Sequence, residues 1–100
     1  MKDIEYERQL DTDVRLRVQY SISRRQVTQF IVQLEVFTEE QWQPVVRYDS
    51  AHRFAHRDFH HPSGKVTKTD LRMSFEEALS FALEDLRDNW EKYKERFLKR

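Results

Sequence analysis

Residues 14–22 read VRLRVQYSI, with an apolar or aromatic side chain at every second position and polar side chains between them. Side chains alternate between the two faces of a β-strand, so this period of two predicts a strand with one face in a core. The stretch VTQFIVQLEVF (27–37) continues the pattern after a short polar turn at 23–26. The two stretches together predict an antiparallel hairpin, from which the rest of the fold extends.

Three further strands are predicted over residues 42–49, 55–61 and 65–72. Pro44 cannot donate to a strand ladder and favours an edge or strand-entry position, while Pro62 and Gly64 mark a turn. Consecutive short connections predict antiparallel pairing, and therefore a meander of four or five strands. The polar residues 1–13 are expected to form a loosely held N-terminal arm beside a single domain over 14–100.

From residue 75 the apolar spacing becomes helical. Ser74 and Glu77 fit a capping box, and no Gly or Pro interrupts the apolar series Phe75, Ala78, Leu79, Ala82, Leu83, Leu86, Trp90, Tyr93, Phe97 and Leu98. A helix of about 25 residues is ~37 Å long, which exceeds a strand of typical length. We therefore predict an α+β fold with one long C-terminal helix packed on one face of the sheet. The end of the helix is expected either to project as a contact for a homodimer or to be covered by the N-terminal arm.

The charge balance excludes a general affinity for polyanions. The chain has 18 Lys and Arg against 18 Asp and Glu, so any affinity for nucleic acid or an anionic membrane has to come from a local patch. The absence of cysteine excludes a disulfide scaffold and thiolate zinc sites. No apolar run approaches the ~20 residues that cross a bilayer, and the N-terminus lacks an apolar signal core, so we expect a cytoplasmic protein without membrane contact.

The segment RYDSAHRFAHRDFHHPSGK (47–65) holds all four histidines, three arginines and two aspartates. Metal-free phosphodiester cleavage needs a group that exchanges protons near neutral pH beside cations that stabilise the developing negative charge. The candidate catalytic residues are His56 as acid or base, His52 as its counterpart, and Asp58 as a group that orients an imidazole. The candidate substrate-binding residues are Arg47, Tyr48, Asp49 and Arg57.

Metal binding is a second interpretation of the same histidines. His56 and His60 would stand ~13 Å apart on one strand face, because a strand rises ~3.3 Å per residue. Only His56 and Asp58, two residues apart, could share an ion, with a third ligand from His52 or another strand. No metal ligand and no other cofactor is assigned.

Three further interpretations stay open, because the strand register decides which side chains face each other. The arginines and aromatics of the segment suit single-stranded RNA that is bound without being cleaved. They equally suit a protein interface. A purely structural role would use cross-strand ion pairs on a solvated face, either Arg47–Asp58 or Asp49–Arg57.

The stretch VVRYDSAHRFAHRD (45–58), together with EEALSFALEDLRDNWEKYKERF (76–97), resembles a small uncharacterised bacterial and archaeal family. The hallmark of that family is RYD-x-AHG-x-x-HRD, and the resemblance covers roughly residues 14–97. The RYD matches Arg47, Tyr48 and Asp49, the AH matches Ala51 and His52, and the HRD matches His56, Arg57 and Asp58. Arg53 departs from the pattern, which has glycine there. If that position needs a positive φ, Arg53 strains the turn.

More distantly, the RYD and histidine pattern is similar to the TumE-type toxins of toxin–antitoxin operons. This resemblance implies a toxin that acts on RNA, working as a metal-independent ribonuclease-like enzyme. The contrasting hypothesis is a non-enzymatic interaction module, an antitoxin-like subunit that binds a cognate partner from the same operon through its C-terminal helix.

Overall fold

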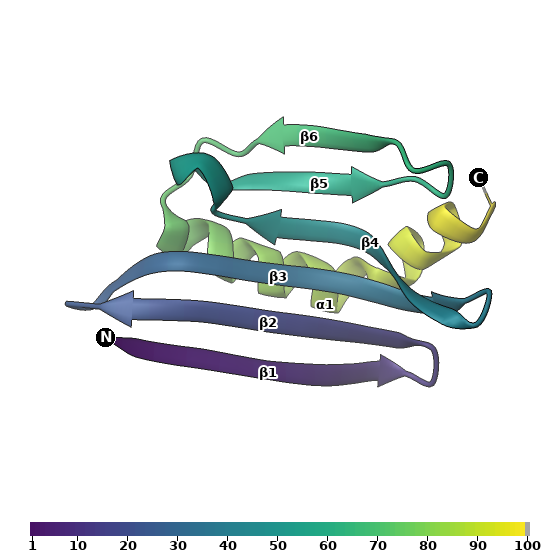
Figure 1. The fold of residues 1–100 in the computed structure, drawn as a ribbon, viewed down its shortest axis with the longest axis horizontal. Helices are drawn as coiled ribbons and strands as arrows, with labels where there is room; N and C mark the ends of the chain where they lie inside the picture. The colour runs from purple at the N-terminus through teal and green to yellow at the C-terminus, as the bar shows by residue number, and fades with distance from the viewer. Residues whose placement is uncertain (100) are drawn as a thin grey trace.

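The computed structural model describes residues 1–99, which form a six-stranded antiparallel sheet and one long helix (Figure 1). The strands follow one another across the sheet in chain order. Their bounds are β1 (Lys2–Asp11), β2 (Val14–Ser23), β3 (Gln26–Thr38), β4 (Gln41–Asp49), β5 (His56–His60) and β6 (Val66–Asp70). A short 3₁₀ turn, η1 (Ala51–Arg53), joins β4 to β5, and α1 (Phe75–Lys99) ends the described chain. The predicted α+β class, with an antiparallel meander followed by a C-terminal helix, is confirmed.

The sheet has one strand more than the upper end of the predicted range, because the expected N-terminal arm is strand β1. Its pairing with β2 runs from Lys2 opposite Ile22 to Asp11 opposite Val14. Only Ile4 and Leu10 of β1 are half-buried, and the other residues are exposed. An edge strand whose outer side lies in solvent tolerates such a polar composition, and charged side chains there disfavour pairing with other chains.

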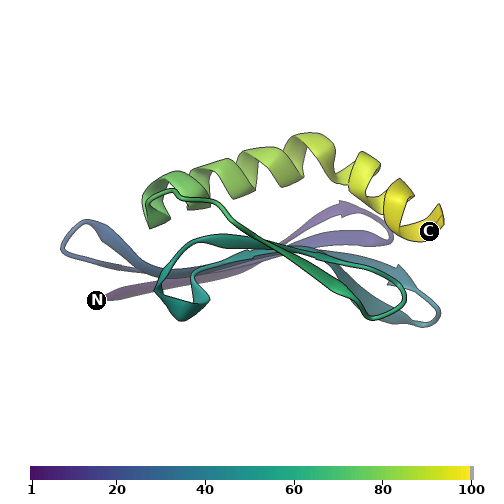
Figure 2. The same ribbon diagram turned by 90° about the horizontal axis from the view of Figure 1, so that it is seen from above.

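The core lies between α1 and the face of the sheet that α1 covers, mainly on β3 and β4 (Figure 2). The inward side chains of the predicted alternation are fully buried there, including Val14, Val18, Phe30, Val32, Leu34 and Val36. Tyr93 and Phe97 near the end of α1 are also buried. They do not project, because strand β3 has 13 residues and supports the helix along most of its length. The sheet itself covers Tyr93 and Phe97, so these two residues do not form the exposed contact expected from the sequence.

The start of α1 has the predicted capping box. The Ser74 hydroxyl accepts a hydrogen bond from the Glu77 amide at 3.1 Å, and the Glu77 carboxylate accepts one from the Ser74 amide at 3.1 Å. The Glu76 carboxylate accepts a further bond from the Val27 amide at 2.7 Å, which ties the first turn of the helix to β3. No helix within residues 1–99 is long and apolar enough to cross a membrane.

Candidate functional site

The face of the sheet opposite α1, called here the open face, carries buried charge. His56 is 1% exposed, and the carboxylates Glu35, Asp49 and Asp58 are 5%, 5% and 7% exposed. No helix of residues 1–99 covers these groups, so long basic side chains lie over them instead. Buried charges of this kind are stable only when they are paired and hydrogen-bonded. The open face therefore contains a connected polar network.

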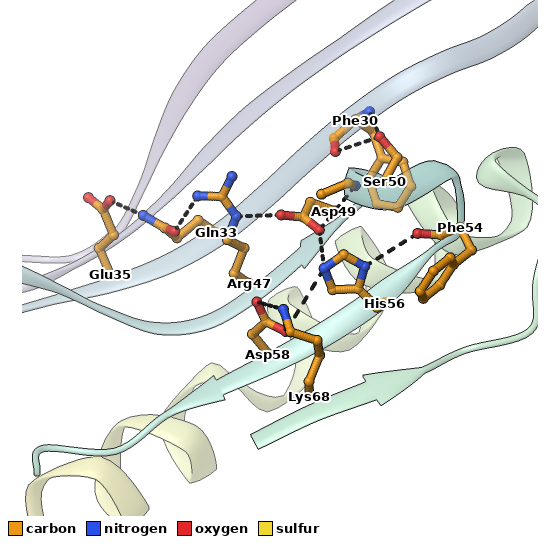
Figure 3. Close-up of polar contacts among 11 residues, drawn as sticks. Phe30, Gln33, Glu35, Arg47, Asp49, Ser50, Phe54, His56, Asp58 and Lys68 are labelled. Atoms are coloured by element: carbon orange, nitrogen blue, oxygen red, sulfur yellow. Dashed lines mark hydrogen bonds and ion pairs between the residues drawn. The ribbon is translucent and has the colours of Figure 1, made fainter. Parts of the chain in front are cut away.

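His56 is the centre of this network (Figure 3). It lies directly opposite Asp49 in the β4–β5 register, with its Nε2 atom 2.6 Å from Asp49 Oδ1. Its Nδ1 atom lies 3.3 Å from the backbone oxygen of Phe54. Both partner atoms are acceptors, so the ring satisfies them when both of its nitrogens carry a proton. No ring nitrogen of His56 is left to exchange a proton with a ligand.

The carboxylates beside His56 are each held by a cation. Arg47 Nε donates to Asp49 Oδ2 at 2.7 Å, and Lys68 Nζ donates to both oxygens of Asp58 at 3.2 Å. Asp58 also lies 4.0 Å from His56 Nε2. Arg47 does stand opposite Asp58 in the register. The ion pairs nevertheless form with Asp49 and Lys68, so the predicted cross-strand pairs Arg47–Asp58 and Asp49–Arg57 are wrong.

The turn η1 places His52 on the surface beside His56. The two imidazole rings are stacked with their centroids 6.5 Å apart and an interplanar angle of 29°. His52 and Arg53 both have positive φ, 64° and 71°, and both are exposed. A positive φ is unfavourable for a residue with a side chain, so the strain expected at Arg53 is present. Figure 2 shows η1 projecting on the side of the sheet away from α1.

A hollow of about 730 Å³ opens beside η1 on the open face. Its walls are formed by β1, β2 and β3 on one side and by the end of β4 and η1 on the other. The η1 side contributes Arg47, Asp49, His52 and Arg53. The opposite wall includes the acidic Asp3 and Glu5, so the two walls differ in charge. The size is typical of a ligand site.

Two of the predicted substrate-binding residues, Tyr48 and Arg57, lie on the other face of the sheet. Tyr48 is fully buried under α1, where its hydroxyl donates to Asp85 at 2.6 Å. Burial, followed by this hydrogen bond to Asp85, raises the pKa of Tyr48 far above its usual range. Arg57 lies with its guanidinium carbon 4.5 Å from the centroid of the Phe59 ring. Neither side chain reaches His52, so both residues serve the core rather than the site.

The sequence pattern missed three members of the network, Gln33, Glu35 and Lys68. Gln33 lies between Arg47 and Glu35 and bonds to both, while Arg15 donates to Glu35 at 2.7 Å. Glu35 could have been recognised from the sequence as a charged residue inside the largely apolar stretch 30–37. No group of three or more His, Asp or Glu side chains within residues 1–99 has the geometry to hold a metal ion.

A family model described as a domain of unknown function, DUF7718, matches residues 1–100. The chain belongs to the DUF7718 family. No curated protein and no solved structure matches the chain significantly. Because the description of DUF7718 assigns no function, the activity has to be inferred from the geometry of the site.

Proposed function

We propose that this DUF7718 protein is a cytoplasmic toxin of the toxin–antitoxin type that acts on RNA, as a metal-independent ribonuclease-like enzyme. The supporting observation is the exposed ring of His52, stacked on the buried ring of His56 at the side of the hollow that carries Arg47 and Arg53. A titratable imidazole held beside two guanidinium groups is what metal-free phosphodiester cleavage needs.

We exchange the roles that the sequence suggests for His52 and His56. His52 is the general acid or base, because its ring is on the surface, whereas both nitrogens of His56 are engaged inside the protein. His56 and Asp49 are positioning residues that fix the plane on which His52 stacks. Asp58 supports them by pairing with Lys68 beside His56.

The proposed reaction is attack by a ribose 2′-hydroxyl on the adjacent phosphorus. His52 accepts the proton of the hydroxyl, the bond to the 5′-oxygen breaks, and water supplies the proton to the leaving oxygen. Arg47 and Arg53 neutralise the negative charge that develops on the phosphoryl oxygens in the transition state. Electrostatic stabilisation of this kind is usually the largest single contribution to catalysis. The acidic wall with Asp3 and Glu5 repels phosphate, so the strand is assigned to the η1 side of the hollow.

Exposed groups near η1 extend this surface. Phe54 is 44% exposed and can stack on a base. The β2–β3 turn, which lies at the same end of the molecule (Figure 1), presents the exposed Arg24 and Arg25. Both have positive φ, 52° and 66°. Glu39 and Glu40 of the β3–β4 turn have nearly the same φ values, so this is the ordinary conformation of a two-residue hairpin turn, and the contribution of Arg24 and Arg25 to the surface is their charge.

The experiment is cleavage of single-stranded RNA by the purified protein in the presence of a chelator. His52→Ala should lower the rate by about a hundredfold or more while the far-ultraviolet circular dichroism stays unchanged. Arg87→Gln, which changes an exposed arginine on α1, should cleave like the wild type. Equal cleavage by His52→Ala and the wild type would exclude the assignment of His52.

The alternative is a non-enzymatic, antitoxin-like module that binds a cognate protein through α1. Two apolar side chains of α1 are partly exposed, Phe81 (41%) at the flank of the helix beside Tyr48 and Leu98 (47%) near its end, and they could contact such a partner or a second copy of the chain. This alternative predicts no RNA cleavage by the wild type. It also predicts a stoichiometric complex that Phe81→Ser disrupts and His52→Ala leaves intact.

A further inference from the structure

A second hollow, of about 540 Å³, lies at the opposite end of β5 from η1. It is bounded by the middle of β4, the β5–β6 turn and the last turns of α1, which meet at one end of the molecule (Figure 1). The turn is well ordered by backbone bonds, from the His61 amide to the Lys65 oxygen at 2.9 Å and from the Gly64 amide to the His61 oxygen at 2.8 Å. The proposed RNA site uses none of these residues.

Every titratable side chain on the walls of this hollow, apart from the Tyr93 hydroxyl, is basic. Lys65 and Arg96 are exposed, and His60 and His61 stand at the end of β5, whereas no Asp or Glu lines the hollow within the described chain. Like charges gathered at one concave place create a positive potential that a bound anion relieves. The hollow beside η1 differs in this respect, because carboxylates stand on its walls.

The interior of the second hollow is apolar. Val45, Val46 and Phe97 form part of its floor and are almost completely buried. The Phe59 ring is already flanked by Arg57, 4.5 Å from its centroid, by Arg96 at 5.7 Å, and by Tyr93, whose ring centroid is 5.6 Å away. A base therefore has little room to stack on Phe59, whereas a hydrocarbon chain can pack on the valines and ring edges.

A further polar side chain at the hollow is His61, whose Nε2 atom lies 3.0 Å from the Thr67 hydroxyl oxygen. The ring of His60 does not contribute, because residues 56, 58 and 60 of β5 share the open face. The charges that act on His60 are accordingly those of Asp58, Arg47 and Lys68.

We propose that the hollow between the β5–β6 turn and the end of α1 binds a small carboxylate with an aliphatic body. The carboxylate pairs with Lys65 and Arg96, and the chain packs on Val46 and Phe97. A hollow of 540 Å³ lies within the usual range for small-molecule sites. The proposal is independent of the RNA site, because it uses other residues at the other end of β5.

The test uses sodium decanoate at monomeric concentrations, with binding followed by amide shifts in a ¹H–¹⁵N correlation spectrum. Decanoate should bind once and shift the amides of Lys65, Thr67 and Phe97 most. The double variant Lys65→Gln/Arg96→Gln should bind at least about tenfold more weakly, while Arg87→Gln binds like the wild type.

Two matched ligands separate charge from hydrophobicity. Decyltrimethylammonium has the same chain with the opposite charge and should not bind, and acetate, which lacks the chain, should bind far more weakly than decanoate. The proposal is overturned if decanoate causes no shifts at these residues, if the double variant binds it equally well, or if the cationic detergent shifts the same amides. Because RNA cleavage by the double variant should stay normal, failure here leaves the RNA site untouched.

Discussion

The two ends of strand β5 lie in different electrostatic surroundings. At its start, His56 is enclosed by the carboxylates of Asp49 and Asp58 and by a backbone oxygen. At its end, Lys65 and Arg96 stand on the walls of the second hollow, and no carboxylate of the described chain lines it. The segment that looks uniform in the sequence therefore has an acidic end and a basic end.

The last histidine of β5 on the open face, His60, has a lowered pKa. Burial lowers it first, and the positive charges of Arg47, Lys68 and His61 lower it further, against the opposing effect of Asp58. The ring of His56, by contrast, lies with both of its nitrogens beside acceptor atoms, Asp49 Oδ1 and the Phe54 oxygen.

The largest effect should come from breaking the acidic end. Asp49→Ala removes the partner of both the buried His56 ring and the half-exposed Arg47 guanidinium, so the free energy of unfolding should fall by about 3 kcal/mol. Asp70→Ala, which changes an exposed aspartate on β6, should cost about 1 kcal/mol or less. Urea denaturation at neutral pH measures both. Similar losses of unfolding free energy in the two variants would show that the contacts of Asp49 stabilise the fold no more than those of an exposed residue.

The next effect concerns alkaline stability at the helix-covered side of the basic end. Burial, followed by the hydrogen bond to Asp85, raises the pKa of Tyr93 to about 12. The native state then keeps a proton that the unfolded chain loses above pH ~10, so stability should fall as pH rises from about 10 toward 12. The free energy of unfolding of Tyr93→Phe should fall less over this pH range. The fall that remains comes from Tyr48, whose pKa is also raised. Urea denaturation midpoints at about pH 8 and about pH 11 measure this loss of stability. The control Tyr6→Phe changes an exposed tyrosine and should lose as much stability between these pH values as the wild type.

A smaller effect should come from relieving the strain at η1. Arg53 has a φ of 71°, which costs a side-chain residue about 1–2 kcal/mol relative to glycine. Arg53→Gly should therefore raise the free energy of unfolding by about 1 kcal/mol. The gain is smaller than the strain itself, because glycine loses more backbone entropy on folding. Arg53→Ala removes the guanidinium but keeps the strain and should give no gain. Thermal unfolding of the two variants distinguishes backbone strain from charge.

The smallest effect is the acid response of His60. Because the pKa of His60 is lowered in the folded state, the unfolded chain binds more protons below pH ~6.5, and stability should fall as pH drops through this region. His60→Gln should remove this contribution while leaving the neutral-pH stability close to that of the wild type. An unchanged slope of unfolding free energy against pH in this variant would place the acid response elsewhere.

Much of the scaffold is readable from the sequence, because period-two and helical spacing report directly on which side is buried. The strands after residue 14 and the capping box at Ser74 were found in this way. Strand β1 was missed although Ile4, Tyr6 and Leu10 alternate with polar residues, because acidic side chains dominate the stretch. Edge strands bury little, so their apolar signal is weak.

The site was only partly predictable. Local sequence identified the stretch that holds His52, His56 and Asp49, but burial and pairing depend on the register between β4 and β5. The positions of Tyr48 and Arg57 on the opposite face follow from the same register. Asp85, which binds Tyr48 and Tyr93 under α1, had a signal as a charged residue on the apolar side of the helix. The basic hollow could not be predicted, because its walls come from three distant segments.

The most direct test of the central claim is an NMR titration of the four histidine rings with a short single-stranded RNA that carries a 2′-deoxy block at the cleavage position. The ring nitrogens and carbons of His52 should respond most and His56 through its stacking contact, while His60 and His61 stay unchanged. A response confined to His60 and His61, with His52 unaffected, would contradict the assignment of RNA to the η1 end of β5.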